Sequence, residues 1–210
     1  MKNKSRDSLR HTAEHQRRTI LNAILAHVPF DGWTEAAWKS GIRQCSITPG
    51  EAELLFPRGL RDVMDLFGAA TDEAMLARIQ KEHGLVGFRV RDKIAFAVRA
   101  RLEFLMPHRE ALRRLMIWYA MPLHWPLGAK RLYRTVDLAW RAAGDTSTDF
   151  NFYTKRGLLA GVVKATTLFW LDDDTPGCRA SWAFLDRRIA EVLQAGQTIG
   201  KLKSRLFATG

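Results

Sequence analysis

The sequence predicts an all-α protein. No stretch keeps the apolar–polar alternation of a strand, whereas apolar residues recur at helical spacing along most of the 210 residues. Residues that start and end helices separate these stretches: Thr34 and Thr48 stand before helical patterns, and Gly32 and Gly41 follow them. These signals predict a series of helices joined by short turns.

Four helices are expected in the first 70 residues: 17–30, 34–41, 49–56 and 58–70. Pro49 suits a first helical position, where a missing N–H costs nothing. Three helices with this turn spacing are typical of a helix-turn-helix module. The runs GWTEAAWKSG and TPGEAELLFP resemble the N-terminal domain of TetR-type regulators.

The helix that would enter the DNA major groove carries Glu51 and Glu53 and neither Lys nor Arg. Phosphate contacts supply most of the affinity for DNA, and residues 1–70 hold only +2 of the chain's net charge of +11. We therefore expect no DNA binding, and a TetR-type regulator with a hydrophobic effector is the alternative function. The excess charge lies in 71–210 and indicates an anionic partner: nucleic acid, lipid headgroups or an acidic protein.

Residues 71–210 are expected to form a second, helical domain after the module of residues 1–70. Thr71 is predicted to cap its first helix, Pro107 to break a helical pair over 92–121, and a loop to cover 121–128. Helices follow over 130–143, from Gly144 to Leu171 and over 179–195, and the turn LDDDTPG is expected to be solvated.

Basic residues recur between 89 and 114, which indicates a solvated face or a surface for anionic lipid or an acidic partner. Trp125 would cover the core or contact a membrane or partner. The last residues, IGKLKSRLF, could lie on a membrane, although the segment is too short to bind strongly by itself.

Arg156 does not fit the apolar stretch that contains it. It shares a helical stripe with Phe152, Leu159 and Val163, and no carboxylate stands three or four residues away. Because an unpaired buried charge is costly, either an acid from another helix or a ligand must neutralise the guanidinium.

Catalytic motifs are missing: the sequence has no P-loop, GxGxxG, GxSxG or HExxH, and no Glu-x-x-His pair for a di-iron site. His11 and His15 are expected to be solvated, and Cys45 and Cys178 to be reduced structural thiols. We therefore predict no catalytic residue, metal or cofactor, with a metal-dependent enzyme as a further possibility. The many apolar side chains suit a pocket between helices, and no apolar run is long enough to span a membrane.

The runs AWRAAGDTSTDFNFYTKR and WAFLDRRIAEVLQAGQT resemble the ubiquinone-biosynthesis protein Coq-nine family, whose hallmark is GDTSTDxNxYTxR. The resemblance implies a TetR-like fold without DNA binding, a homodimer, and a cavity that holds a phospholipid or an isoprenoid quinone. It also implies that the protein has no catalytic activity of its own. The protein would instead present the cargo to the di-iron hydroxylase of demethoxyubiquinone.

Transferred residue by residue, the resemblance implies that Arg156 meets a lipid headgroup, and we expect Tyr153, Leu159 and Val163 to contact lipid with it. It also implies a partner surface at Phe152 and Tyr153, to which we add Asp149; Phe152 replaces the usual Trp. Members of the family carry a longer amphipathic C-terminal helix for membrane binding. We therefore expect that this chain docks more weakly on an anionic membrane than they do, that it docks through residues 89–114 instead, or that the two copies of a dimer share the docking. We expect a cytoplasmic protein bound peripherally to the inner membrane, on the matrix side in a eukaryote.

Overall fold

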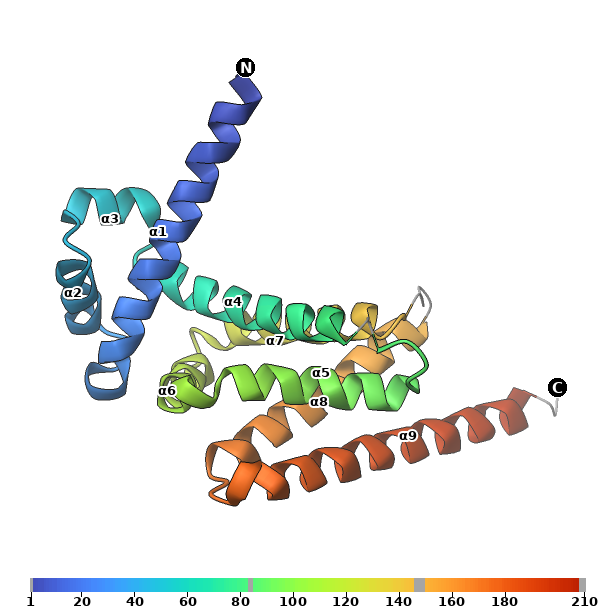
Figure 1. Ribbon diagram of the computed structural model, residues 1–210. Coiled ribbons are helices and arrows are strands. Elements are labelled where there is room, and N and C mark those ends of the chain that lie inside the picture. The colour runs from blue at the N-terminus through green and yellow to red at the C-terminus, as the bar shows by residue number, and fades with distance from the viewer. Residues whose placement is uncertain (1, 83–84, 146–149, 208–210) are drawn as a thin grey trace. The chain divides into compact units, whose positions relative to one another are not determined.

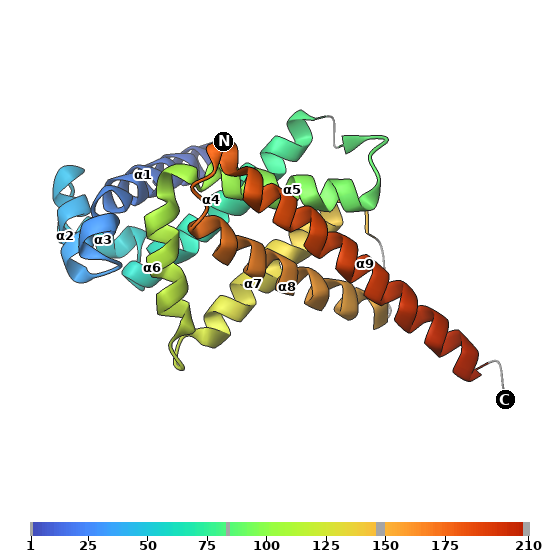
Figure 2. The same cartoon turned by 90° about the horizontal axis from the view of Figure 1, so that it is seen from below.

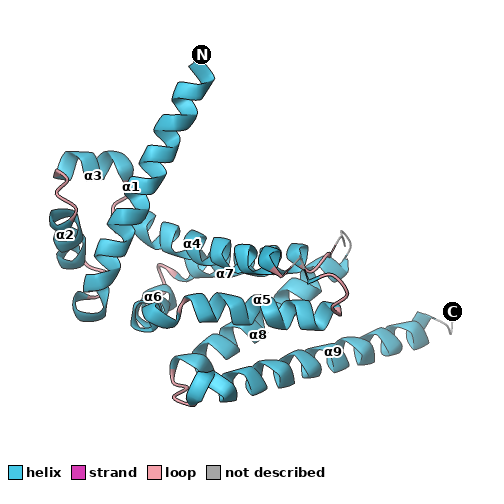
Figure 3. Cartoon of the chain, in the orientation of Figure 1, coloured by secondary structure: helices cyan, strands magenta, loops and turns pink. Residues whose placement is uncertain are grey.

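The computed structural model describes residues 2–82, 85–145 and 150–207; for 2–10, 150–152, 193 and 195–207 it describes the helical backbone alone. Every regular element in this part of the chain is a helix (Figures 1 and 3), which confirms the all-α prediction. The order is α1 (Lys2–Asp31), α2 (Glu35–Gln44), α3 (Pro49–Leu55), α4 (Leu60–Lys81), α5 (Val90–Phe104), η2 (Met106–His108), α6 (Arg109–Ala120), α7 (Trp125–Ala142), α8 (Phe150–Leu171), η3 (Pro176–Cys178) and α9 (Arg179–Phe207).

The chain forms two units, the first from Met1–Glu73 and Leu105–Gly128, the second from Ala74–Phe104 and Ala129–Gly210. The helix-turn-helix-like module expected over 1–70 lies in the first unit, where α6 joins it. None of the helices in the described ranges is long and apolar enough to cross a bilayer.

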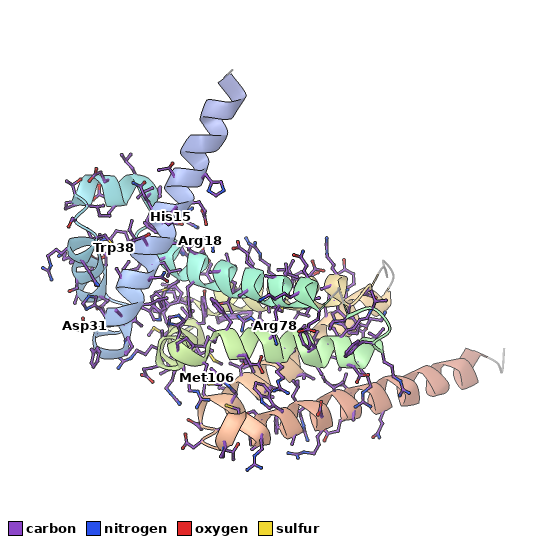
Figure 4. The ribbon with its side chains drawn as sticks, viewed as in Figure 1. His15, Arg18, Asp31, Trp38, Arg78 and Met106 are labelled. Carbon is purple, nitrogen blue, oxygen red and sulfur yellow. The ribbon has the colours of Figure 1, made fainter. Side chains whose placement is uncertain are left out.

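In the first unit, α1 and α2 pack at close range. A Cβ atom added to Gly41 of α2 would lie 2.8 Å from the backbone nitrogen of Ile24 on α1 and 2.9 Å from its Cα, so only glycine allows this approach. The α6 helix is fixed to the end of α1, because Arg114 Nη2 donates to the Pro29 carbonyl at 2.8 Å. Trp38, labelled on α2 in Figure 4, meets Phe56 edge-on at 5.7 Å between ring centres.

The expected start of α3 is confirmed. The Thr48 hydroxyl accepts from the Glu51 backbone N–H at 3.3 Å, and the Glu51 carboxylate accepts from the Thr48 backbone N–H at 2.8 Å, with Pro49 in the first helical position. This capping box also lowers the pKa of Glu51, chiefly through the backbone N–H of Thr48. One of the two acids of α3 is thus used to begin its own helix.

The predicted helix start at Thr71 is wrong, because α4 runs without a break from Leu60 to Lys81. The Thr71 hydroxyl donates to the Phe67 carbonyl one turn earlier, at 2.8 Å, and so caps nothing. The proposed boundary between residues 70 and 71 therefore falls inside a helix.

In the second unit α8 and α9 lie side by side (Figure 2), and α5 packs against both. Two boundaries differ from prediction. The α7 helix begins at Trp125 rather than at residue 130, because Pro126 lies in its first turn, where no N–H is needed. The C-terminal segment predicted as a separate tail continues α9 without interruption to Phe207.

The acidic turn between α8 and α9 is exposed at Asp172 and Asp174, as the sequence suggested, but not at Asp173. Asp173 is buried, and its carboxylate accepts four hydrogen bonds, from the backbone N–H and hydroxyl groups of Thr175 and Ser181. Burial alone would raise the pKa of Asp173, but these bonds outweigh it and hold the pKa well below its ordinary value. The residue anchors the start of α9.

Replacing Asp173 by asparagine should lower the free energy of unfolding at neutral pH by about 2–3 kcal/mol, because two of the four donors lose a charged acceptor. The folded state favours the ionised carboxylate, so its stabilisation is fully present above the ordinary Asp pKa of about 4 and disappears as the pH falls below it. Urea unfolding of both proteins from pH 7 to pH 3 tests this. A stability difference that does not shrink in acid would contradict it.

Candidate functional site around Arg156

Arg156 lies on α8 with 2% of its surface exposed, and two carboxylates meet its guanidinium. Nε donates to Asp137 Oδ1 of α7 at 2.8 Å, and Nη1 donates to Asp145 Oδ2 at 3.1 Å. Asp145 follows the end of α7 and is itself 5% exposed in its side chain. Pairing on two sides compensates the cost of removing these charges from water.

The end of α7 explains how Asp145 reaches Arg156. Gly144 has φ +90°, a left-handed conformation that favours glycine. Its N–H donates to the Arg141 carbonyl at 3.0 Å, and the N–H of Asp145 reaches back to the Trp140 carbonyl at 3.0 Å. This is a Schellman ending, which reverses the chain and brings Asp145 against α8.

Further side chains extend the cluster. Lys155 Nζ lies 2.9 Å from Asp145 Oδ1 and 5.6 Å from the centre of the Trp140 ring. Trp140 Nε1 donates to the Lys155 carbonyl at 3.2 Å, and Arg141 Nε lies 2.8 Å from Asp137 Oδ2. These contacts hold the end of α7 and the Gly144–Asp145 turn against α8.

The sequence left open whether an acid or a ligand neutralises Arg156, and in the structure acids do so. Helical spacing could not identify them, because Asp137 and Asp145 precede Arg156 by 19 and 11 residues. A signal was present, however, because the run AWRAAGDTSTDFNFYTKR contains Asp145, Lys155 and Arg156 together.

The other predicted site residues do not form one surface. Leu159 and Val163 are buried in the second unit, whereas Tyr153 is 67% exposed. Asp149 and the side chain of Phe152 lie outside the described residues.

One side of α8 is exposed, although the stretch that forms it is largely apolar in sequence. Tyr153 begins a stripe with Gly157, Gly161, Lys164 and Leu168 that faces solvent in this single chain. A Cβ atom added to either glycine would meet open space.

Comparison with known proteins assigns the region around the run GDTSTDFNFYTKR to a family. The model of the COQ9 family matches residues 125–196, which contain the whole Arg156 cluster. A COQ9-B protein of Xenopus laevis, named a mitochondrial ubiquinone biosynthesis protein, is 30% identical and aligns with 91% of this chain and 67% of its own length. The chain belongs to the COQ9 family. The COQ9 protein of Rattus norvegicus is 31% identical over 197 residues, and the alignment spans 91% of this chain but 63% of the rat protein.

The fold matches a TetR transcriptional regulator from Nitrosomonas europaea, with a TM-score of 0.68, 18% identity and coverage of 85% of this chain and 98% of the regulator. This confirms the predicted TetR-like architecture. At this identity the likeness shows the fold alone.

Proposed function

We propose that this COQ9-family protein is a non-catalytic accessory of ubiquinone biosynthesis that carries a polyprenyl quinone intermediate and presents it to the demethoxyubiquinone hydroxylase. The observation that carries the proposal is the match to ubiquinone biosynthesis proteins over 91% of the chain, with the hallmark GDTSTDFNFYTKR inside it. The Arg156 cluster supports it, because Asp145, Lys155 and Arg156 of this run form ion pairs that hold α8 against the end of α7.

The cargo contact is proposed on the apolar side of α8. Leu159 and Val163 stand one and two turns after Arg156 on that side, and both are buried. A headgroup that reached Arg156 would have to compete with Asp137 and Asp145, each within about hydrogen-bonding distance of the guanidinium. Headgroup binding by Arg156 stays a prediction on which the cargo proposal does not depend.

The solvent-facing stripe of α8 suits protein contacts. We assign Tyr153, with Phe152 and Asp149, to the hydroxylase, because exposed aromatic residues are common anchors of interfaces. The open positions at Gly157 and Gly161 would allow a second copy to approach closely, which supports the proposed homodimer. Peripheral association with an anionic membrane completes the proposal, since the cargo is a membrane lipid.

Purification followed by organic extraction and mass spectrometry tests the cargo. We expect an isoprenoid quinone or phospholipid in roughly stoichiometric amount, and protein without any lipid would contradict the proposal. Tyr153→Ala should weaken capture of the hydroxylase by about tenfold without changing thermal stability, because the side chain is exposed. Thr154→Ala, at the neighbouring exposed position, is the matched control.

A TetR-type regulator is the second candidate, favoured only by the fold. The helix α3 exposes Glu51 and Glu53 and has no Lys or Arg between Pro49 and Leu55. Salt-sensitive and sequence-selective binding to DNA would revive this candidate.

A further inference from the structure

Residues 85–91, named the 85–91 turn, comprise the end of the connection between α4 and α5 and the first two residues of α5. Leu85 anchors it with a side chain that is almost fully buried, although its backbone has a left-handed φ of +58°. Its N–H donates to the Glu82 carbonyl at 2.9 Å, and the N–H of Phe88 donates to the Leu85 carbonyl at 3.1 Å. Gly87, at φ +81°, completes the reversal. The buried Leu85 side chain and these backbone hydrogen bonds therefore fix the conformation of the turn.

The side chains that follow Leu85 are apolar and exposed. Val86 is 82% exposed, Phe88 54% and Val90 51%. Single exposed apolar residues are ordinary on a protein surface, but three at alternate positions form a cluster that water solvates poorly. Such a cluster indicates a surface that contacts another molecule when the protein functions.

Cations alternate with these residues. Arg89 and Arg91 are exposed, and Lys93 follows one turn into α5. The nearest acid along the chain, Asp92, lies 3.3 Å from Arg91 Nε, whereas Arg89 forms no ion pair with any carboxylate in the described ranges. Glu82, on the other side of the turn, lies 3.8 Å from Arg78. The local charge is thus positive.

We propose that the 85–91 turn docks the protein on an anionic lipid surface. Val86, Phe88 and Val90 would enter the boundary between headgroups and acyl chains, and the arginines would meet the phosphates beside them. The apolar turn at Met121–Trp125 is a weaker candidate, because His124 is its only ionisable side chain and stacks on Trp118. The inference rests on the proposed membrane association but not on the identity of the cargo.

Sedimentation with vesicles tests the proposal. The purified protein is mixed with vesicles of phosphatidylcholine alone or with about a third phosphatidylserine, neither containing quinone, so failure here leaves the cargo proposal intact. We expect binding to the anionic vesicles that weakens with salt. Each cation near such a surface is worth roughly fivefold in affinity, so Arg89→Gln with Arg91→Gln should weaken binding on the order of 30-fold. Phe88→Ser should weaken it by about tenfold.

The matched control is Arg179→Gln with Arg187→Gln, which removes the same charge from exposed positions on α9. If the control variant lost as much affinity for anionic vesicles, the attraction would depend on net charge and not on a docking surface. That result would overturn the proposal. The proposal would also be overturned if the variants of Arg89, Arg91 and Phe88 lost capture of the hydroxylase but kept their binding to vesicles. That result would favour an acidic protein partner. Circular dichroism of each variant confirms that the fold is retained.

Discussion

Replacing Arg156 by alanine should lower the free energy of unfolding by about 3–5 kcal/mol, as is typical when one partner of a buried ion pair is removed. The substitution removes the cation that Asp137 and Asp145 both contact, and the side chain of Asp145 is almost fully buried. Chemical denaturation of the purified protein measures the change.

Arg141→Ala is the matched control, because Arg141 pairs with the same Asp137 but lies at the surface, with 67% of its side chain exposed. An exposed ion pair is worth at most about 1 kcal/mol, so this variant should remain close to the original protein. Arg156→Lys should lose an intermediate amount, since lysine keeps the charge but not the planar fork that meets two acids. Equal effects of Arg156→Ala and Arg141→Ala would contradict the buried-network interpretation.

Lipid occupancy of the Arg156 variants distinguishes a structural role of this residue from direct binding of a headgroup. If the guanidinium acts through the position of α8, Arg156→Lys should keep its cargo at temperatures where it remains folded. Folded Arg156→Lys protein that carries no lipid would instead support direct contact with a headgroup.

The second large effect is expected at Gly41. Gly41→Ala should destabilise the first unit by about 2–3 kcal/mol, despite the better helix propensity of alanine. The new methyl group would meet backbone atoms of Ile24 at less than 3 Å, and backbone cannot move aside as a flexible side chain can, so α1 and α2 must separate. Thermal unfolding followed by circular dichroism measures the loss.

Gly50→Ala supplies the comparison, because Gly50 is also helical and in the first unit, but an added Cβ there meets nothing within 4 Å. It should leave stability unchanged or raise it by up to about 1 kcal/mol. A similar loss in both variants would show that backbone propensity, and not the approach of α1 to α2, limits Gly41.

Local chemistry explains which parts of the fold could be predicted. The helix start at Thr48 and Pro49 depends on adjacent residues, and the break at Pro107 follows from the missing N–H, so both appear in the structure as expected. The reciprocal bond from Glu51 to Thr48 was not predicted. Thr71 and Asp173 show the limit of such signals. A threonine can begin a helix or bond back within one, and an aspartate in a polar turn can be solvated or buried, depending on what packs against it.

The sequence by itself determined the helical class, the membership of the COQ9 family through the GDTSTDFNFYTKR run, and the need for a partner to Arg156. These depend on residue order and on the cost of a buried charge, which are independent of the fold. Only the tertiary structure decided that Asp137 and Asp145 meet that charge, that Gly41 lies against Ile24, and that Val86, Phe88 and Val90 remain exposed. Each of these depends on which helices lie together, because burial and pairing arise between segments far apart in the chain.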